Sequence, residues 1–233
     1  MIKQIILSKS LLLFFSFTDQ KFQCSSFKSK CFPDFVFKVP GIRKMHHTDI
    51  RQHGSGNAGT TNALRTFGKK AGALTLLGDC LKCVFAIAAV RLFFRGSCGD
   101  ILPLLSMYAA AGCVLGHNFP FYMNFKGGKG IAVMAGLILC TNWWTTLICL
   151  VAFVSVVFFT RYISAGSLLV SFLYAVLIVI NGQTGRFGME APCLYEMYVL
   201  GFALMALAWY RHKANIKRLL SGTENKFGNP SKK

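Results

Sequence analysis

Long apolar runs separated by short polar turns dominate the sequence after residue 70. A membrane-spanning helix needs about 20 mostly apolar residues, or fewer inside a packed bundle. Glycine, asparagine and charged residues interrupt the apolar pattern, for example at Gly96, Asn142 and Asn181-Gly182. The pattern predicts helices near residues 71–93, 101–116, 130–141, 143–160, 165–181 and 194–210. We therefore expect an all-α fold, a polytopic transmembrane bundle with six spans, of which the third is short enough to be partly re-entrant.

The first 48 residues do not follow this pattern. Residues 5–17 are apolar, but this run is short and contains Lys9, so a span here is doubtful. No small-residue cleavage site follows in a suitable position, which argues against a cleaved signal peptide. We divide the chain into an atypical N-terminal segment (1–48), a membrane domain (49–228) and a tail (229–233). An irregular anchor, a disordered tail and a misread start are the alternatives for the first segment.

The composition supports a membrane protein with cationic loops. Of the 233 residues, 54% are hydrophobic and 15% are charged, whereas soluble domains carry about 25% charged residues. Lysine and arginine number 26 against 8 acidic residues, a formal charge of +18. A basic balance alone is also typical of nucleic-acid binding, but the apolar excess favours the membrane, and we expect no nucleic-acid partner. The nine cysteines include no two paired CxxC motifs, so we predict no metal site, disulfide framework or cofactor.

The distribution of cations predicts the orientation. If the loop at residues 43–70 is cytoplasmic and the six runs alternate, only Arg91, Arg95 and Arg186 fall outside. Apart from Lys82, which lies inside a run, every other lysine and arginine from residue 43 onward is then on the cytoplasmic side. Because cytoplasmic loops are enriched in these residues, we expect the C-terminus and all three polar patches described next to be cytoplasmic.

The first polar patch, residues 49–72, is rich in glycine, hydroxyl and amide residues. Turns with free backbone N–H groups next to cations can wrap an anion, whereas a solvated linker rarely needs so many glycine and amide positions together. An ordinary polar linker remains the alternative. The candidate phosphate-binding residues are Arg51, Ser55, Gly56, Asn57, Thr61 and Asn62.

The second patch, residues 116–130, contains the motif FKGGKG. If Gly130 opens the following helix, Lys126, Lys129 and the N–H groups of Gly127 and Gly128 meet at its positive end, which is a phosphate site. The motif is not a Walker A loop. Binding of lipid headgroups by the two lysines is the alternative, but it would not require glycines around them.

The third patch is divided between residues 160–167 and 210–228. His212 and Asn215 are three residues apart and so share one helix face. Lys213, Lys217 and Arg218 read more simply as interfacial anchors. Glu224 is one of only two acids in the predicted cytoplasmic loops, and a structural ion pair is its simplest interpretation.

Asp79 and Lys82 are three residues apart inside an apolar run and can form an ion pair on one helix. Ionisable groups at this depth are candidates for function, and bracing of the loop above them is an equally good interpretation.

His117 is followed five residues later by Tyr122 rather than by aspartate, so the histidine–aspartate box of one class of glycerolipid acyltransferases is absent from the sequence. GxSxG and HExxH motifs are absent from it too. The three polar patches thus contain many candidate phosphate-binding residues and few candidate bases. Such a site suits a substrate whose leaving group is already activated.

Together, SGNAGTTNALRTFGKKAG, TLLGDCLK, GHNFPFYMNFKGGKG, TRYISAGS and NIKRLLSGTENK resemble the bacterial acyl-phosphate:glycerol-3-phosphate acyltransferases, the PlsY family, from about residue 49 to 227. The resemblance implies an enzyme of the bacterial inner membrane with about seven helices and a cytoplasmic site. It would transfer an acyl group from acyl phosphate to glycerol 3-phosphate, giving lysophosphatidate for phospholipid synthesis. Coupling to an enzyme that forms the acyl phosphate is also implied.

By position, the resemblance assigns Arg51, Lys126 and Lys129 to the cationic phosphate grip and Asn57 to the first loop motif. Ser164 and Ser167 match a motif that holds glycerol phosphate, His212 and Asn215 match paired residues after the last helix, and Glu224 matches the acid of a GTE motif. His212 and a substrate phosphate are both open as the base. The rival functions are a transporter of an organic phosphate and a non-enzymatic adaptor that binds anionic lipid.

The chain departs from the family pattern at its start. The family begins with a helix that ends in a GSIPFG-like turn, whose serine helps line the site, and residues 1–48 contain no such turn. A frameshifted or wrongly started reading frame and a diverged first helix are the two interpretations. Either would leave the bundle without one wall, so the departure bears on the activity of this chain.

Overall fold

The computed structural model describes residues 50–228. The predicted segment 1–48 with its doubtful span, and the tail 229–233, lie outside these residues. Regular structure in the described part is helical, which confirms the all-α fold class. It comprises η1 (Ile50–Gln52), α4 (Thr60–Phe94), η2 (Gly99–Ile101), α5 (Leu102–Asn118), η3 (Phe121–Met123), α6 (Ile131–Thr141), α7 (Trp143–Thr160), α8 (Ile163–Gln183), α9 (Ala191–Arg211) and α10 (Lys213–Leu220), where η denotes a single 3-10 turn.

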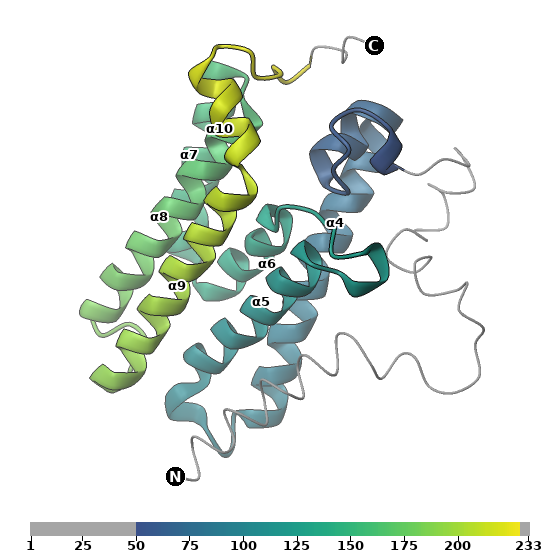
Figure 1. The fold of residues 1–233 in the computed structure, drawn as a ribbon. Coiled ribbons are helices and arrows are strands. Elements are labelled where there is room, and N and C mark those ends of the chain that lie inside the picture. Colours follow the sequence, from purple (N-terminus) through teal and green to yellow (C-terminus); the bar gives the residue numbers. More distant parts are fainter. Residues whose placement is uncertain (1–49, 229–233) are drawn as a thin grey trace, which may run out of the picture.

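Each of the six predicted apolar runs forms a helix, but the third is not a full span. Five helices of the described region, α4, α5 with η2, α7, α8 and α9, are long and apolar enough to cross a bilayer. α6 has 11 residues and is therefore about 16 Å long, roughly half of the hydrocarbon thickness. The expected six spans are thus five long helices and one short one. The loop between α5 and α6 lies well below the ends of α7 and α10, so α6 begins partway down the bundle (Figure 1).

A break at Gly68 shapes the start of α4. Gly68 has φ of +86° and ψ of −177°, a conformation that only glycine adopts without strain. The first two turns of α4 fold back on the rest of the helix, and a Cβ on Gly72 would lie 2.6 Å from the Cβ of Leu64. The break turns this segment towards the C-terminal region, where Arg65 Nη2 donates to the carbonyl oxygen of Asn225 at 3.1 Å.

α6 lies inside the bundle and packs closely against α4. Gly136 permits this approach, since a Cβ there would lie 2.4 Å from the carbonyl oxygen of Cys80. Small residues commonly let membrane helices approach each other closely. Val133 and Met134 of α6 are fully buried in the same core as Met107 of α5.

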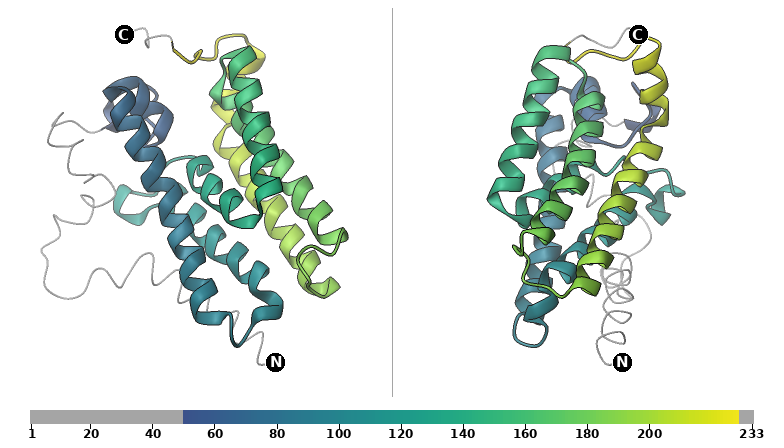
Figure 2. Two further views of the ribbon diagram at one scale, coloured as in Figure 1. Left: turned by 180° about the vertical axis from the view of Figure 1, so that it is seen from behind. Right: turned by 90° about the vertical axis from the view of Figure 1, so that its left-hand side faces the viewer.

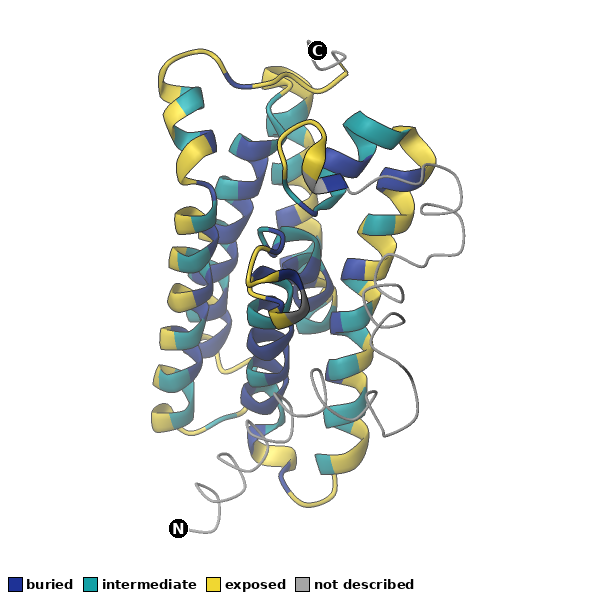
Figure 3. Ribbon diagram, turned by 45° about the vertical axis from the view of Figure 1, so that its right-hand side comes forward, coloured by how far each residue is buried: buried dark blue, intermediate teal, exposed yellow. Residues whose placement is uncertain are grey.

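The outward faces of α4 and α7 expose large apolar side chains. Phe85 is 66% exposed, Phe158 77% and Phe159 81%. Figure 3 shows this division, with buried positions turned inwards and exposed positions along the outer faces of the long helices. An extended apolar surface around a buried interior is what a helix bundle presents to lipid.

The first and third predicted polar patches gather at one end of the bundle, and the second lies lower, in the loop between α5 and α6. The start of α4, the turn between α7 and α8, and α10 lie at the top in Figure 1, whereas η2 and the turn between α8 and α9 lie at the bottom. The views in Figure 2 show the same arrangement. The described part of the chain therefore brings distant segments together at the end where the chemistry was predicted.

Candidate active site

A cavity of about 590 Å³ lies between α4, α6, α7, α8 and the C-terminal region. Polar residues of all three patches line one part of it, and apolar side chains of α4, α6 and α7 line the rest. The predicted site residues that line it are Ser55, Asn57, Thr61, Asn62, Asp79, Lys129, Ser164, Ser167, His212, Asn215 and Glu224. Gly56, Lys82, Lys126, Gly127 and Gly128 are outside its lining, and the side chain of Arg51 is outside the described part of the structure.

A hydrogen-bonded chain connects the second and third patches. Lys129 Nζ donates to Asn215 Oδ1, and Asn215 Nδ2 donates to Glu224 Oε1 at 2.9 Å. Arg218 Nε donates to the other carboxylate oxygen of Glu224 at 2.8 Å. The carboxylate of Glu224 therefore orients both an amide and a guanidinium at the cavity, and it forms an ion pair with Arg218.

Cations outnumber acids around this chain of contacts. Burial and the nearby charges of Arg218, Arg65 and Arg211 together lower the pKa of Lys129 to about 8, against the opposing effect of Glu224. An ammonium with a depressed pKa beside other cations is stabilised by a bound anion, because the anion offsets their mutual repulsion. The arrangement is therefore suited to dianionic phosphate groups.

His212 stands where α9 ends and α10 begins. Its Nδ1 lies 2.7 Å from the carbonyl oxygen of Ala208, and a carbonyl can only accept, so Nδ1 carries the proton and Nε2 has the free lone pair. Burial and the charge of Lys129 lower the pKa of His212 to about 4. At neutral pH His212 is an uncharged ring whose Nε2 can accept a hydrogen bond from a hydroxyl group.

Several buried polar atoms of the cavity wall have no partner among the described residues. Ser164 Oγ and Thr60 Oγ1 are two of them, and both residues line the cavity. Ser167 Oγ, by contrast, donates to the carbonyl oxygen of Ile163 at 2.9 Å. Since buried polar groups are normally hydrogen-bonded, Ser164 and Thr60 are the better candidates for contacts with a ligand.

Asn62 has a structural task in the first patch. Its Oδ1 accepts from the backbone N–H of Ser55 at 2.9 Å, and its Nδ2 donates to the carbonyl oxygens of Ile50 and His53 at 3.1 and 3.0 Å. A Cβ on Gly54 would lie 2.3 Å from Asn62 Oδ1. The amide of Asn62 therefore fixes the loop, and its predicted phosphate contact lacks a free donor.

The amides of Gly127 and Gly128, which were predicted to bind phosphate, have hydrogen-bond partners within the protein. Gly127 N–H donates to the carbonyl oxygen of Asn118 at 3.2 Å, and Gly128 N–H donates to that of His117 at 3.1 Å. Lys126 is exposed and lies outside the cavity lining. The expected helix start is confirmed, because α6 begins directly after Gly130, which itself lines the cavity.

The structure adds residues that were missing from the predicted site. Arg65 and Arg218 both line the cavity. Arg65 is four residues after Thr61, and Arg218 is three residues after Asn215, so helical spacing could have placed each beside a predicted residue. Arg218 had been read as an interfacial anchor, an interpretation that its bond to Glu224 corrects.

Comparison with known proteins gives consistent matches. The glycerol-3-phosphate acyltransferase family matches residues 36–222. A glycerol-3-phosphate acyltransferase of Clostridioides difficile is 42% identical over 188 residues, covering 80% of this chain and 85% of the relative. One of Thermotoga petrophila is 39% identical over 193 residues, covering 82% of this chain and 88% of the relative.

Solved structures match as well. The crystal structure of PlsY, an integral membrane glycerol 3-phosphate acyltransferase, in its glycerol 3-phosphate form has a TM-score of 0.70 and 29% identity, covering 94% of this chain and 96% of that chain. Its lysophosphatidic acid form gives a TM-score of 0.66 at 27% identity. The family match over most of the sequence, the identity of the relatives and the shared helical architecture together show that this chain belongs to the glycerol-3-phosphate acyltransferase family of integral membrane proteins.

Proposed function

We propose that this chain is a membrane glycerol-3-phosphate acyltransferase. It transfers an acyl group from an acyl phosphate to the 1-hydroxyl of glycerol 3-phosphate and so forms lysophosphatidate for phospholipid biosynthesis. One observation carries the proposal: a single cavity combines a cationic, hydrogen-bonding part with an apolar part that reaches the lipid-facing surface. The solved relatives, described in glycerol 3-phosphate and lysophosphatidic acid forms, support it.

The cationic part is suited to two phosphate groups. Lys129, Arg65 and Arg218 line it, and the first turn of α6 adds backbone N–H groups that have no partner within the helix. Both substrates carry a phosphate with close to two negative charges, which repel each other in water. Cations on several sides of one chamber offset that repulsion and let the two substrates lie together.

The apolar part is suited to the acyl chain. Leu77 of α4, Leu139 of α6 and Leu150 of α7 line the cavity and are 54%, 56% and 57% exposed. Side chains that both line a cavity and face outward mark a sideways opening. An acyl phosphate therefore reaches the site from the bilayer, with its chain between α4 and α7 and its phosphate near Lys129.

The reaction needs little covalent chemistry from the protein. The 1-hydroxyl oxygen of glycerol 3-phosphate attacks the acyl carbon, a new ester C–O bond forms, and the C–O bond to phosphate breaks. Phosphate leaves with the bonding electron pair. Holding the two reactants in this geometry lowers the barrier by roughly 7–11 kcal/mol, and each donor aimed at the developing oxyanion contributes about 3–4 kcal/mol.

His212 and Ser164 orient the glycerol. His212 Nε2 accepts a hydrogen bond from a glycerol hydroxyl, and Ser164 Oγ supplies the partner on the opposite helix, α8. Because the pKa of His212 is held at about 4, the ring is a weak base, and the departing phosphate is the better final acceptor of the hydroxyl proton. The protein positions the hydroxyl, and the substrate takes up its proton.

We place the protein in the inner membrane of a bacterial cell, with the cavity and C-terminus on the cytoplasmic side. The excess of lysine and arginine in the loops at the cavity end supports this orientation. An acyl phosphate is a reactive mixed anhydride, so we also propose functional coupling to the enzyme that forms it.

Product formation by the purified protein tests the proposal. In detergent, with labelled glycerol 3-phosphate and palmitoyl phosphate, we expect labelled lysophosphatidate and an equal amount of free phosphate. Omitting palmitoyl phosphate, or replacing it with palmitate, is the matched control and gives no labelled lipid. A transporter or a lipid-binding adaptor would form no product in detergent, so the absence of labelled lipid from folded protein would refute the proposal.

A further inference from the structure

A buried charged cluster, of which Asp79 and His117 line the cavity, takes no part in the mechanism above. Asp79 is 5% exposed in an otherwise apolar part of α4. Lys82 Nζ donates to Asp79 Oδ1 at 2.8 Å and lies 2.9 Å from Nδ1 of His117, on α5. Asp79 Oδ1 and His117 Nδ1 lie 3.3 Å apart. Charged groups at this depth cost free energy of folding unless they are paired, and they are candidates for function.

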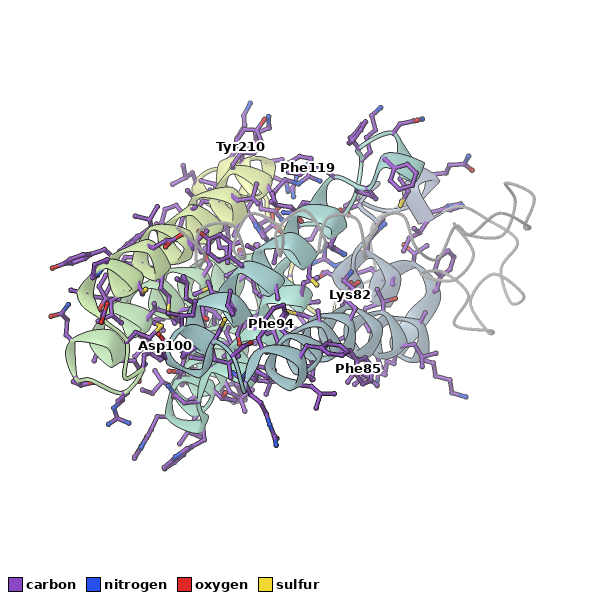
Figure 4. The ribbon with its side chains drawn as sticks, turned by 90° about the horizontal axis from the view of Figure 1, so that it is seen from below. Lys82, Phe85, Phe94, Asp100, Phe119 and Tyr210 are labelled. Carbon is purple, nitrogen blue, oxygen red and sulfur yellow. The ribbon has the colours of Figure 1, made fainter. Side chains whose placement is uncertain are left out.

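The orientation of α4 turns this charged cluster towards the interior of the bundle. In Figure 4 Lys82 lies on the inner side of α4, whereas Phe85, one turn away, points outward. The side chain of Lys82 is 31% exposed and that of His117 is 8% exposed. The cluster therefore joins α4 to the last turn of α5, directly before the loop that carries Lys129.

The imidazole of His117 lies against Gly128. A Cβ on Gly128 would lie 2.0 Å from His117 Nε2 and 2.7 Å from Cε1, and a Cβ on Gly127 would lie 2.0 Å from the carbonyl oxygen of His117. Neither glycine has a positive φ. The two glycines are thus required by the closeness of α5 rather than by their backbone conformation.

The opposite side of the same turn is held by α9. Arg211 Nη2 donates to the carbonyl oxygens of Gly127 and Gly128 at 2.9 and 2.8 Å, and Arg211 lies 5.2 Å above the ring of Phe119. The turn is therefore clamped between His117 and Arg211, and the next residue is Lys129.

We propose that His117, held by Asp79 and Lys82, is a positioning residue that fixes the Gly127–Gly128 turn and thereby the phosphate contact of Lys129. The inference rests on the proposed acyl transfer, and it assigns the two glycines of FKGGKG to packing rather than to substrate binding. A displacement of about 1 Å at a reacting group can cost about 100-fold in rate, so a small shift of the turn is expected to be visible in the kinetics.

A double-mutant cycle between His117 and Gly128 tests the clamp. Gly128→Ala forces a methyl group into the imidazole, and we expect kcat/KM for glycerol 3-phosphate to fall about 100-fold. His117→Ala removes the ring and should cost about 10-fold. With space for the methyl restored, the double variant should match His117→Ala within about threefold. Multiplied losses, about 1,000-fold in total, would overturn the inference.

A second cycle asks whether His117 acts through Lys129. In a Lys129→Ala background, His117→Ala should cause little further loss, since the contact that it positions is already gone. Direct contact with substrate, or general damage to the fold, predicts the same 10-fold loss in either background and would overturn the assignment. The Lys129→Ala reference must retain measurable turnover, which radiolabelled substrate allows.

Two further variants serve as a substitute for His117→Ala and as a matched control. His117→Asn keeps an acceptor for Lys82 while removing the part of the ring that faces Gly128, and it replaces His117→Ala in both cycles if the alanine variant does not fold. Gly116→Ala is the matched control, since a Cβ there meets no atom within 4 Å, and it should retain wild-type kinetics. Activity of the wild-type protein tests the proposed function by itself, so the two failures are distinguishable.

Discussion

The two lysines of FKGGKG provide the sharpest test of the active site. The motif makes Lys126 and Lys129 look equivalent, but only Lys129 lines the cavity, where its Nζ donates to Asn215 Oδ1. Lys129→Ala removes the charge-assisted phosphate contact that we propose for this half-buried side chain, and it leaves Asn215 Oδ1 without its donor. Losses of this kind amount to about 3–4 kcal/mol, which corresponds to roughly 150- to 1,000-fold. Lys126→Ala removes an exposed charge outside the cavity and should cost less than about threefold.

The assay is the initial rate of labelled lysophosphatidate formation by each purified variant over a range of glycerol 3-phosphate concentrations. Elution as a single species in detergent, at the wild-type position, shows that a variant is folded. Equal losses in the two variants would show that the motif acts as a basic patch, and a larger loss in Lys126→Ala would contradict the placement of Lys129 at the phosphate.

Three further predictions concern pH, the histidine and the acyl chain. Because the pKa of Lys129 is about 8 and its cationic form binds phosphate, kcat/KM should fall as pH rises above about 8, and Lys129→Arg should move this fall to higher pH. With a pKa of about 4, His212 stays neutral from pH 5.5 to 8. His212→Ala should therefore lower kcat by about 10- to 100-fold without changing the shape of the pH profile. Loss of an ionisation near pH 6.5 from the profile of this variant would contradict the prediction. Ala135 lines the apolar part of the cavity, so Ala135→Phe should lower turnover of palmitoyl phosphate at least about tenfold more than that of octanoyl phosphate, and equal losses would argue against an acyl slot there.

The sequence determined the helices, because their signal is local. An apolar run bounded by glycine, asparagine or charge needs no distant partner to be read, and all six runs became helices. The depth of α6 was harder to read, since 11 residues fit equally well as a re-entrant piece or as a short span until the loop before it is placed.

The sequence also determined the chemistry of the site in outline. Lys129, Ser164, His212 and Asn215 come from distant segments, yet motif content and cation distribution placed them at one end, and they line one cavity. Arg65 was missing from the predicted site, because nothing local shows that the break at Gly68 folds its segment back towards Asn225.

Only the tertiary structure decided which of the equivalent-looking groups are used. The side-chain amide of Asn62 donates to backbone carbonyl oxygens of its own loop. The backbone amides of Gly127 and Gly128 donate to carbonyl oxygens of α5. Lys126 lies outside the cavity that Lys129 lines. Residue types and spacing state which hydrogen bonds a group is able to make. Whether a donor is already satisfied depends on atoms brought close by long-range packing, and that information is absent from any single stretch of sequence.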